Sequence, residues 1–111
     1  MTAAARFGVR LTRGAEDDLE RLRDYLVEHR SPAEADSLLD GILEKVATLE
    51  RFPDRGAVPK EIADLGLREF RQALLGPYRI IYRVAGNSVF VVLIADGRRD
   101  MQALLERRLL G

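Results

Sequence analysis

Hydrophobic positions recur at helical spacing in the first half of the chain and at strand spacing in the second half. Residues 6–12 alternate polar and apolar side chains, which predicts a short first strand. Thr12 is a suitable N-cap for a helix whose first turn is acidic and which ends near His29. The apolar face of that helix comprises Ala15, Leu19, Leu22 and Leu26.

A second helix start follows almost at once. In Ser31-Pro32-Ala33-Glu34 the serine caps, the proline suits the first helical position and the glutamate suits a capping box. Phe52-Pro53 is predicted to end this helix. With so short a linker, the two helices should form an antiparallel hairpin. The predicted core face of the second helix is Ala35, Leu38, Leu39, Ile42, Val46 and Leu49.

The second half of the chain predicts three strands. A turn-rich segment over 53–67 precedes them and leaves space for one helical turn at 60–65. Gly76-Pro77 and Gly86-Asn87 supply the turns, and the second is a strong signal for a two-residue hairpin. The predicted strands are 68–75, 78–85 and 88–95, and residues 100–110 can form a short terminal helix.

The order strand, helix, helix, then three strands predicts an α+β fold. We expect the helical hairpin to pack on one face of a small, mainly antiparallel sheet. A length of 111 residues suits one domain spanning 1–111.

Composition gives expectations about location and about the classes of site. The chain has no cysteine, which excludes disulfides and thiolate metal sites and suits a reducing compartment. Its longest apolar run, 89–95, is too short to span a bilayer, and the opening residues show no signal-peptide pattern. We therefore expect a cytoplasmic protein with no membrane association.

A net charge of zero hides an asymmetry. Residues 1–67 carry ten Lys or Arg against fourteen Asp or Glu, whereas residues 68–111 carry eight against four. All eight cations of the second half are arginine, which suits bidentate recognition of phosphate or carboxylate. Chance clustering on a solvated surface is the alternative. Independent, sequence-specific nucleic-acid binding is not expected, because such proteins are usually more basic overall.

Motifs for metal or histidine chemistry are missing from the sequence. The single histidine, His29, lies at a predicted helix end, where a cation is favoured for structural reasons. The sequence contains no zinc-binding His-Glu-x-x-His, no phosphate-binding glycine loop and no Gly-x-Ser-x-Gly elbow. We predict neither a metal nor a cofactor.

Arginines on the predicted sheet are the remaining candidates for chemistry. Arg79 and Arg83 share one face of a strand, and Arg71 on the preceding strand lies near Arg79 in some registers. Arg98 and Arg99 follow the last strand. Such a group can stabilise the charge of a phosphate. RNA cleavage also needs a proton acceptor and a proton donor, and arginine holds its proton too firmly to serve well.

The residues that carry these arginines resemble a known family. Tyr78-Arg79-Ile80 is followed by Tyr82-Arg83, and Gly97-Arg98-Arg99-Asp100 follows an apolar strand. In this order and spacing they resemble the RelE/ParE superfamily of bacterial toxin–antitoxin systems, and its ParE branch more closely. The resemblance extends over nearly the whole chain.

The resemblance implies a toxin that is neutralised by a cognate, ParD-like antitoxin. ParE-like members inhibit DNA gyrase and are not hydrolases, whereas RelE-like members cut mRNA on ribosomes. Of the RelE pattern, Arg79 and Arg99 are at matching positions and would be the catalytic candidates. The expected lysines fall on or near Phe70 and Gln72, and the expected tyrosine falls near Leu105. These departures favour the ParE branch.

The resemblance has two further implications, one for the contacts with a target and one for whether the protein is active. Asp96 stands where ParE-like sequences often have histidine, so the fine contacts with a target are open. An inactive member that only binds its antitoxin is a third possibility beside the gyrase inhibitor and the mRNA endoribonuclease.

Antitoxins of such pairs are typically partly disordered and fold on contact. A helix laid in an apolar groove and a strand added to a sheet edge both suit this fold. Leu22, Tyr25 and Leu26 are the predicted groove residues, although each can instead pack in the core of the toxin itself. The candidates for contact with a target are Arg71, Arg79, Arg83, Arg98 and Arg99. Acidic antitoxin segments could cover Arg79, Arg83, Arg98 or Arg99.

Overall fold

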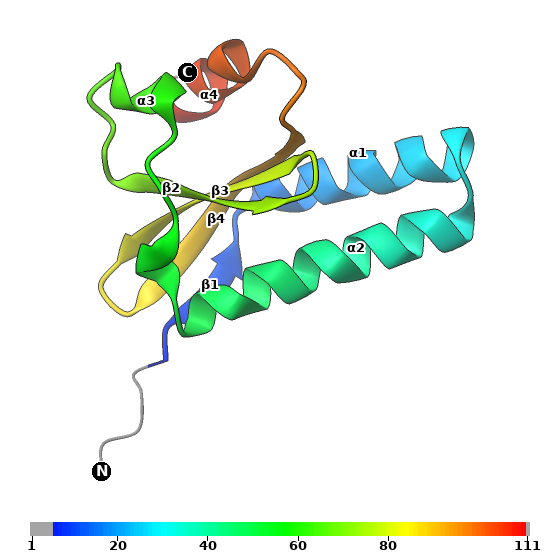
Figure 1. Ribbon diagram of the computed structural model, residues 1–111, viewed down its shortest axis with the longest axis horizontal. Coiled ribbons are helices and arrows are strands. Elements are labelled where there is room, and N and C mark those ends of the chain that lie inside the picture. Colours follow the sequence, from blue (N-terminus) through cyan, green and yellow to red (C-terminus); the bar gives the residue numbers. More distant parts are fainter. Residues whose placement is uncertain (1–5, 111) are drawn as a thin grey trace.

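The structure of the protein is a computed structural model, in which residues 6–110 are described. Four strands form one sheet in the order β1-β4-β3-β2, with a helical hairpin on one side and two shorter helices on the other (Figure 1). The predicted α+β fold is confirmed. The elements are β1 (Gly8–Leu11), α1 (Arg13–His29), α2 (Pro32–Ala47), η1 (Thr48–Glu50), η2 (Pro53–Arg55), α3 (Lys60–Ala63), β2 (Phe70–Leu75), β3 (Tyr78–Ala85), β4 (Ser88–Asp96) and α4 (Met101–Leu110).

Glycine turns set the two antiparallel pairings. The β2–β3 turn closes with Leu75 opposite Tyr78, and the β3–β4 turn closes with Ala85 opposite Ser88. The first residue of each turn is a glycine with positive φ, +56° at Gly76 and +60° at Gly86, a conformation that costs glycine little. β1 pairs with β4 in parallel, so the sheet is mixed but mainly antiparallel, as predicted.

A β-bulge on β4 keeps apolar side chains on both faces of the sheet. Ile81 pairs with Leu93 and Tyr82 pairs with Val91, so Val92 is the extra residue. The bulge leaves Val91 in the core cluster beneath the hairpin, while Leu93 belongs to the cluster on the opposite face.

The helical hairpin forms where its caps were predicted. The Thr12 hydroxyl accepts from the amide of Ala15 at 3.3 Å, and the Ser31 hydroxyl accepts from the amide of Glu34 at 3.1 Å. The prediction that α2 continues to Phe52 is wrong. It ends at Ala47, where the chain tightens into η1, yet Leu49 remains buried within that turn.

The sheet is covered on both faces: the hairpin packs on one face, as expected, and α3 and α4, whose positions were not predicted, cover the other. On the second face Ile62 of α3 and Met101 and Leu105 of α4 pack against Ile81 and Leu93. β3 and β4 carry apolar side chains on both faces of the sheet. Both faces must therefore be covered, because apolar surface would otherwise be exposed to water. Three layers result: hairpin, sheet, and the pair α3–α4.

Predicted boundaries of the shorter elements differ by a few residues from the structure. β1 and β2 each begin two residues later than expected, and the helical turn α3 ends at Ala63 rather than at 65. The terminal helix is present, and the Asp100 carboxylate caps it by accepting from the amide of Ala103 at 3.1 Å. Residues 1–5, part of the segment inspected for a signal peptide, lie outside the described residues.

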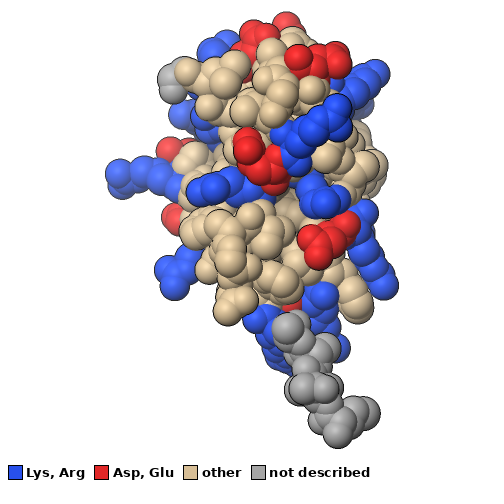
Figure 2. Space-filling view, turned by 90° about the vertical axis from the view of Figure 1, so that its left-hand side faces the viewer, with Lys and Arg blue, Asp and Glu red and all other residues tan. Residues whose placement is uncertain are grey.

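Charges of both signs occur together over much of the surface. On the face shown in Figure 2, basic and acidic side chains are mixed, and several basic side chains project at the margins. No described helix combines the length and the apolar character needed to cross a membrane.

Candidate functional site: an arginine groove

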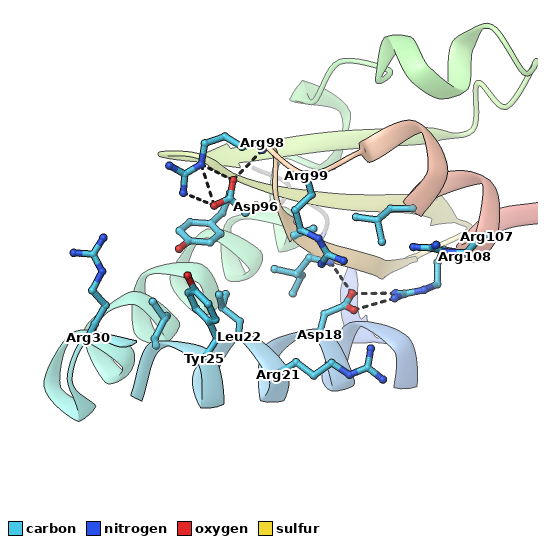
Figure 3. A pocket seen from close by; sticks show the side chains of 15 residues that line it. Asp18, Arg21, Leu22, Tyr25, Arg30, Asp96, Arg98, Arg99, Arg107 and Arg108 are labelled. Carbon is cyan, nitrogen blue, oxygen red and sulfur yellow. Dashed lines mark hydrogen bonds and ion pairs between the residues drawn. The ribbon is translucent and has the colours of Figure 1, made fainter. Parts of the chain in front are cut away.

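A groove of about 740 Å³ runs between α1, the end of β4 and α4 (Figure 3). Six arginines and two aspartates line it together with apolar and aromatic side chains. We call it the arginine groove. Its charged lining residues are Asp18, Arg21, Arg30, Asp96, Arg98, Arg99, Arg107 and Arg108.

The groove brings together two sets of residues that the sequence predicted separately. Leu22, Tyr25 and Leu26 line it from α1, and Arg98 and Arg99 line it from the turn after β4. Arg99 points from that turn towards α1 (Figure 3). The groove therefore combines apolar contacts with guanidinium groups: of the predicted residues, those on α1 supply the apolar contacts and those in the turn after β4 supply guanidinium groups.

The three apolar candidates are not equally accessible. Tyr25 is 58% exposed and its ring lies 4.3 Å from the ring of His29, whereas Leu26 is buried. Leu22 is partly buried and packs against the core beneath the hairpin. Of the three, Tyr25 has the largest surface free for a partner.

Arg98 is held by Asp96 at the mouth of the groove. Its Nε donates to Asp96 Oδ1 at 3.0 Å, and its backbone amide donates to the same oxygen at 2.9 Å. This contact lowers the pKa of the Asp96 carboxyl and raises the pKa of the Arg98 guanidinium. Because 79% of the Arg98 side chain remains exposed, the pair orients the guanidinium without hiding it.

Tyr78 lies beside this pair and lines the same groove. Burial raises the pKa of its hydroxyl, and the nearby negative charge of Asp96 raises it further. Tyr78 is therefore a protonated hydrogen-bond donor at neutral pH.

An ion pair closes the opposite end of the groove. Arg108 Nη2 donates to Asp18 Oδ1 at 2.9 Å, and Arg108 Nη1 donates to Asp18 Oδ2 at 3.0 Å and to the carbonyl of Val92 at 2.8 Å. Asp18 Oδ2 also accepts from the amide of Ile94 at 3.0 Å. These contacts join α1 and α4 to β4 at the position where β1 has ended.

Arg79 is engaged inside the protein, on the α3–α4 face of the sheet. Its Nη1 and Nη2 donate to the two carboxylate oxygens of Glu61 at 2.7 and 2.9 Å, and its Nε donates to Gln72 Oε1 at 2.8 Å. The Arg79 contact lowers the pKa of Glu61 to about 2. The pair is largely buried, with exposed side-chain fractions of 14% and 16%.

Arg71 and Arg83 also lie outside the arginine groove. Arg71 pairs in register with Tyr82, on the face of the sheet opposite to Arg79, so a register that places Arg71 beside Arg79 is not found. Its Nη1 donates to the carbonyl of Gly56 at 2.7 Å. Arg83 is exposed, with its guanidinium 5.6 Å from the ring centre of Phe90.

Several groove residues were not among the sequence candidates. Arg21 precedes Tyr25 by four positions, which places both on one side of a helix, and this spacing was a usable signal. Arg30, Arg107 and Arg108 come from helix ends, and their convergence depends on how α1 and α4 dock on the sheet. No periodicity within one segment predicts that docking.

The groove suits binding of an anionic or amphipathic partner better than acid–base chemistry. None of its described lining residues is histidine, lysine or glutamate, and both of its aspartates are paired with arginine. Within residues 6–110, no three His, Asp or Glu side chains gather as a metal ion would require.

Comparison with known proteins identifies the family. The family model for the ParE toxin of type II toxin–antitoxin systems, parDE, matches residues 9–101. The chain belongs to the ParE toxin family. Toxin ParE3 of Caulobacter vibrioides is 30% identical over 99 residues, which cover 87% of this chain and 93% of that relative. The resemblance noted from the signature residues is thereby confirmed.

Two solved structures share the fold of this ParE family member. A chain of the chromosomal ParDE system from P. aeruginosa matches with a TM-score of 0.71 and 23% identity, over 83% of this chain and 97% of that one. A chain of the toxin–antitoxin complex RelBE2 from Mycobacterium tuberculosis matches with a TM-score of 0.62 and 23% identity, over 85% and 94%. At this identity, both matches show the fold alone.

Proposed function

We propose that this ParE-family toxin inhibits DNA gyrase and is neutralised by a cognate antitoxin. The observation that carries the proposal is the arginine groove, in which Arg98 and Arg99 stand exposed beside an apolar wall. Guanidinium groups in this arrangement can bind DNA phosphates or carboxylates of gyrase. Arg98 and Arg99 are the proposed target contacts.

The alternative of an mRNA endoribonuclease has less support from the geometry. Its two catalytic candidates differ in setting, because Arg79 is bound to Glu61 and Gln72 while Arg99 is exposed on the groove. Leu105, near the position expected for the tyrosine, is fully buried under the sheet. An acid–base set around these residues would need groups that the arginine groove does not supply.

The antitoxin is proposed to cover the same groove. An amphipathic helix can lay apolar side chains against Leu22 and Tyr25 and direct carboxylates to the arginines opposite. Binding there would mask Arg98 and Arg99 and so prevent contact with gyrase. A partly disordered antitoxin would order on this surface.

Gyrase supercoiling with the purified toxin tests the target. We expect inhibited supercoiling and accumulation of linear plasmid, which reports gyrase trapped with cleaved DNA. The double variant R98A/R99A should lose both effects and still bind the antitoxin through the apolar wall and the remaining arginines. The control R10A/R68A removes the same charge at exposed positions outside the groove and should inhibit like the wild type.

Three results would contradict the proposal or part of it. Undisturbed supercoiling by active gyrase, with toxin shown to be folded, would move the target to mRNA on ribosomes or leave a protein that only binds its antitoxin. Full inhibition by R98A/R99A would leave gyrase as the target but remove these two arginines from the contact. Ribosome-dependent mRNA cleavage by the wild type that is lost in R79A, with the variant shown to be folded, would establish the endoribonuclease instead.

A further inference from the structure

One end of the arginine groove carries more positive charge than its own aspartate can balance. α1 contributes Asp18 and Arg21, α4 contributes Arg107 and Arg108, and Arg99 comes from the turn after β4. We call these five residues the α1–α4 end of the groove. Four arginines against one aspartate leave an excess of three positive charges there.

Helical spacing brings these side chains together. Arg21 follows Asp18 by three positions on α1, so both lie on one side of that helix. On α4, Arg107 follows Leu104 by three positions, and both line the groove. Arg99 points from its turn towards α1, on the side of the groove where Asp18 lies (Figure 3). Three separate elements therefore direct arginines to the same end.

Asp18 is already engaged and does not pair with three of these arginines. Its Oδ1 accepts from Arg108 Nη2, and its Oδ2 accepts from Arg108 Nη1 and from a backbone amide of β4. Within residues 6–110, no carboxylate oxygen lies within 4.0 Å of a guanidinium nitrogen of Arg21, Arg99 or Arg107. All three side chains are exposed, so an anion from outside the chain can reach them.

The carboxylates nearest in sequence do not neutralise this end either. Asp17 precedes Arg21 by four positions, a spacing at which helix residues often pair, yet the two form no ion pair. In the turn after β4, the carboxylate of Asp96 is held by Arg98, and that of Asp100 caps α4. Because like charges repel, the uncompensated arginines favour binding of an anion.

The donors indicate the chemical class of that anion. Each guanidinium presents paired N–H groups, and three of them suit a phosphate group, whose oxygens point in several directions, better than one planar carboxylate. Tyr25 and Tyr78 line the same groove, and the ring of Tyr25 is 58% exposed. Positive charge along a groove, with aromatic rings on which bases can stack, is typical of proteins that hold single strands of nucleic acid.

We propose that the α1–α4 end of the arginine groove binds the phosphodiester backbone of a DNA strand through Arg21, Arg99 and Arg107. This inference rests on the proposed function, because the strand belongs to the DNA that gyrase holds, and it adds two arginines to the contact. Arg108 is a positioning residue, since Asp18 and β4 hold its guanidinium. Phosphate contacts carry no sequence information, so the binding is independent of sequence.

Binding of a labelled single-stranded oligodeoxynucleotide of mixed sequence tests the site. Fluorescence anisotropy with the free toxin, over a range of salt concentrations, gives the affinity and its salt dependence. R21A/R107A should bind at least about tenfold more weakly than the wild type, and the slope of log K against log salt should be smaller by about one. The control R10A/R68A removes the same charge outside the groove and should bind like the wild type.

Further variants separate charge from geometry and one end of the groove from the other. R21K/R107K keeps the charge but loses the paired donors, so its affinity should lie between those of R21A/R107A and the wild type. R99A should weaken binding more than R98A, because Asp96 already holds the guanidinium of Arg98. Since Arg21 and Arg107 are exposed, circular dichroism should show R21A/R107A folded with an unchanged melting temperature. In the supercoiling assay it should need at least about tenfold more toxin.

Three outcomes would overturn the inference. They are no binding of the oligonucleotide by folded wild type at low salt, equal binding by R21A/R107A and R10A/R68A, and a larger loss in R98A than in R99A. If R21A/R107A instead loses affinity for the antitoxin alone, these arginines bind carboxylates of a protein. Oligonucleotide binding without gyrase inhibition by the wild type would contradict the proposed target and leave the phosphate site valid. Gyrase inhibition without oligonucleotide binding would do the reverse, so the two failures are distinguishable.

Discussion

At the scale of single residues, Arg79 shows how a signature arginine can serve the fold. Its guanidinium joins β3 to Glu61 of α3 and Gln72 of β2. Its aliphatic stem lies under the next turn, because a Cβ on Gly97 would be 2.8 Å from Arg79 Cδ. Arg79 therefore supports the turn that presents Arg98 and Arg99.

Replacement of Arg79 should cost stability. Arg79→Ala leaves Glu61 largely buried without its ion partner, and we expect the free energy of unfolding to fall by about 2–3 kcal/mol. The exposed Arg83 is the control on the same face of the same strand. Arg83→Ala should change the free energy of unfolding by less than about 1 kcal/mol. Urea denaturation of both variants measures the difference. Equal losses would contradict the structural role of Arg79.

The same pair predicts how stability depends on pH. The folded protein lowers the pKa of Glu61 from 4.5 to about 2, so the carboxylate stabilises the fold at pH values above 4.5. As the pH falls from 4.5 towards 2, Glu61 protonates more readily in the unfolded chain and this stabilisation is lost. The difference in unfolding free energy between wild type and Glu61→Gln should shrink over that range. A difference that stays constant from pH 7 to 3 would refute the linkage.

At the scale of elements, α4 is joined to the rest of the molecule by the polar contacts of Arg108 as well as by its apolar face. Arg108 binds Asp18 and the Val92 carbonyl, and Gly14 leaves space for it, because a Cβ there would lie 2.8 Å from Arg108 Nη1. The contact closes the free edge of β4 and forms one end of the arginine groove. It therefore controls both the position of α4 and the access to that edge.

Arg108→Met should loosen α4 without unfolding the sheet. Methionine keeps much of the aliphatic volume but loses the bonds to Asp18 and Val92, at a cost of about 1–3 kcal/mol. Hydrogen exchange should become faster for the amides of α4 and for Ile94, while the amides of α2 keep their protection. Uniformly faster exchange over the whole chain would show instead that the pair contributes to global stability alone.

Sequence patterns identified the elements whose signals are local. The caps at Thr12 and Ser31 and the turns at Gly76 and Gly86 each depend on a few adjacent residues, and all four were predicted. The early end of α2 was missed, because the stop was placed at Phe52-Pro53, whereas the chain already tightens into η1 at Thr48, whose hydroxyl donates to the Lys45 carbonyl at 2.6 Å.

The second covered face of the sheet and the ion pair of Arg79 were not predicted, because both depend on contacts between residues far apart along the chain. The apolar run over 89–95 was a signal for burial on both faces, but it does not say which elements provide the cover. Glu61 lies eighteen positions before Arg79 in a turn-rich segment, and only the packing of α3 brings it near. Contacts of this kind between distant residues decide which arginines stabilise the fold and which line the arginine groove.

At the scale of the whole molecule, two grooves with different linings divide the surface available to partners. The arginine groove carries six arginines against two aspartates. A second groove, along the outer edge of β2, carries Lys45, Arg51 and Arg55 against Glu44, and we call it the β2-edge groove. Because the chain has zero net charge, acidic side chains elsewhere balance the excess of basic residues in the two grooves. The acidic antitoxin segments proposed here would be attracted to both, whereas the proposed contact with gyrase needs the first alone.

This division predicts that only one groove binds the DNA strand. R21A/R107A removes two positive charges from the arginine groove and R51A/R55A removes two from the β2-edge groove, and the two linings share no residue. At physiological salt the Debye length is about 8 Å, so exposed charges outside the binding groove are largely screened. We therefore expect R51A/R55A to bind the oligonucleotide within about threefold of the wild type, in contrast to R21A/R107A. Anisotropy titrations at equal salt measure the difference, and equal losses would mean that the charge of the whole molecule attracts the strand. Because the antitoxin is proposed to cover the arginine groove, an excess of antitoxin should also release the bound oligonucleotide, whereas a stable ternary complex would place the two partners on different surfaces.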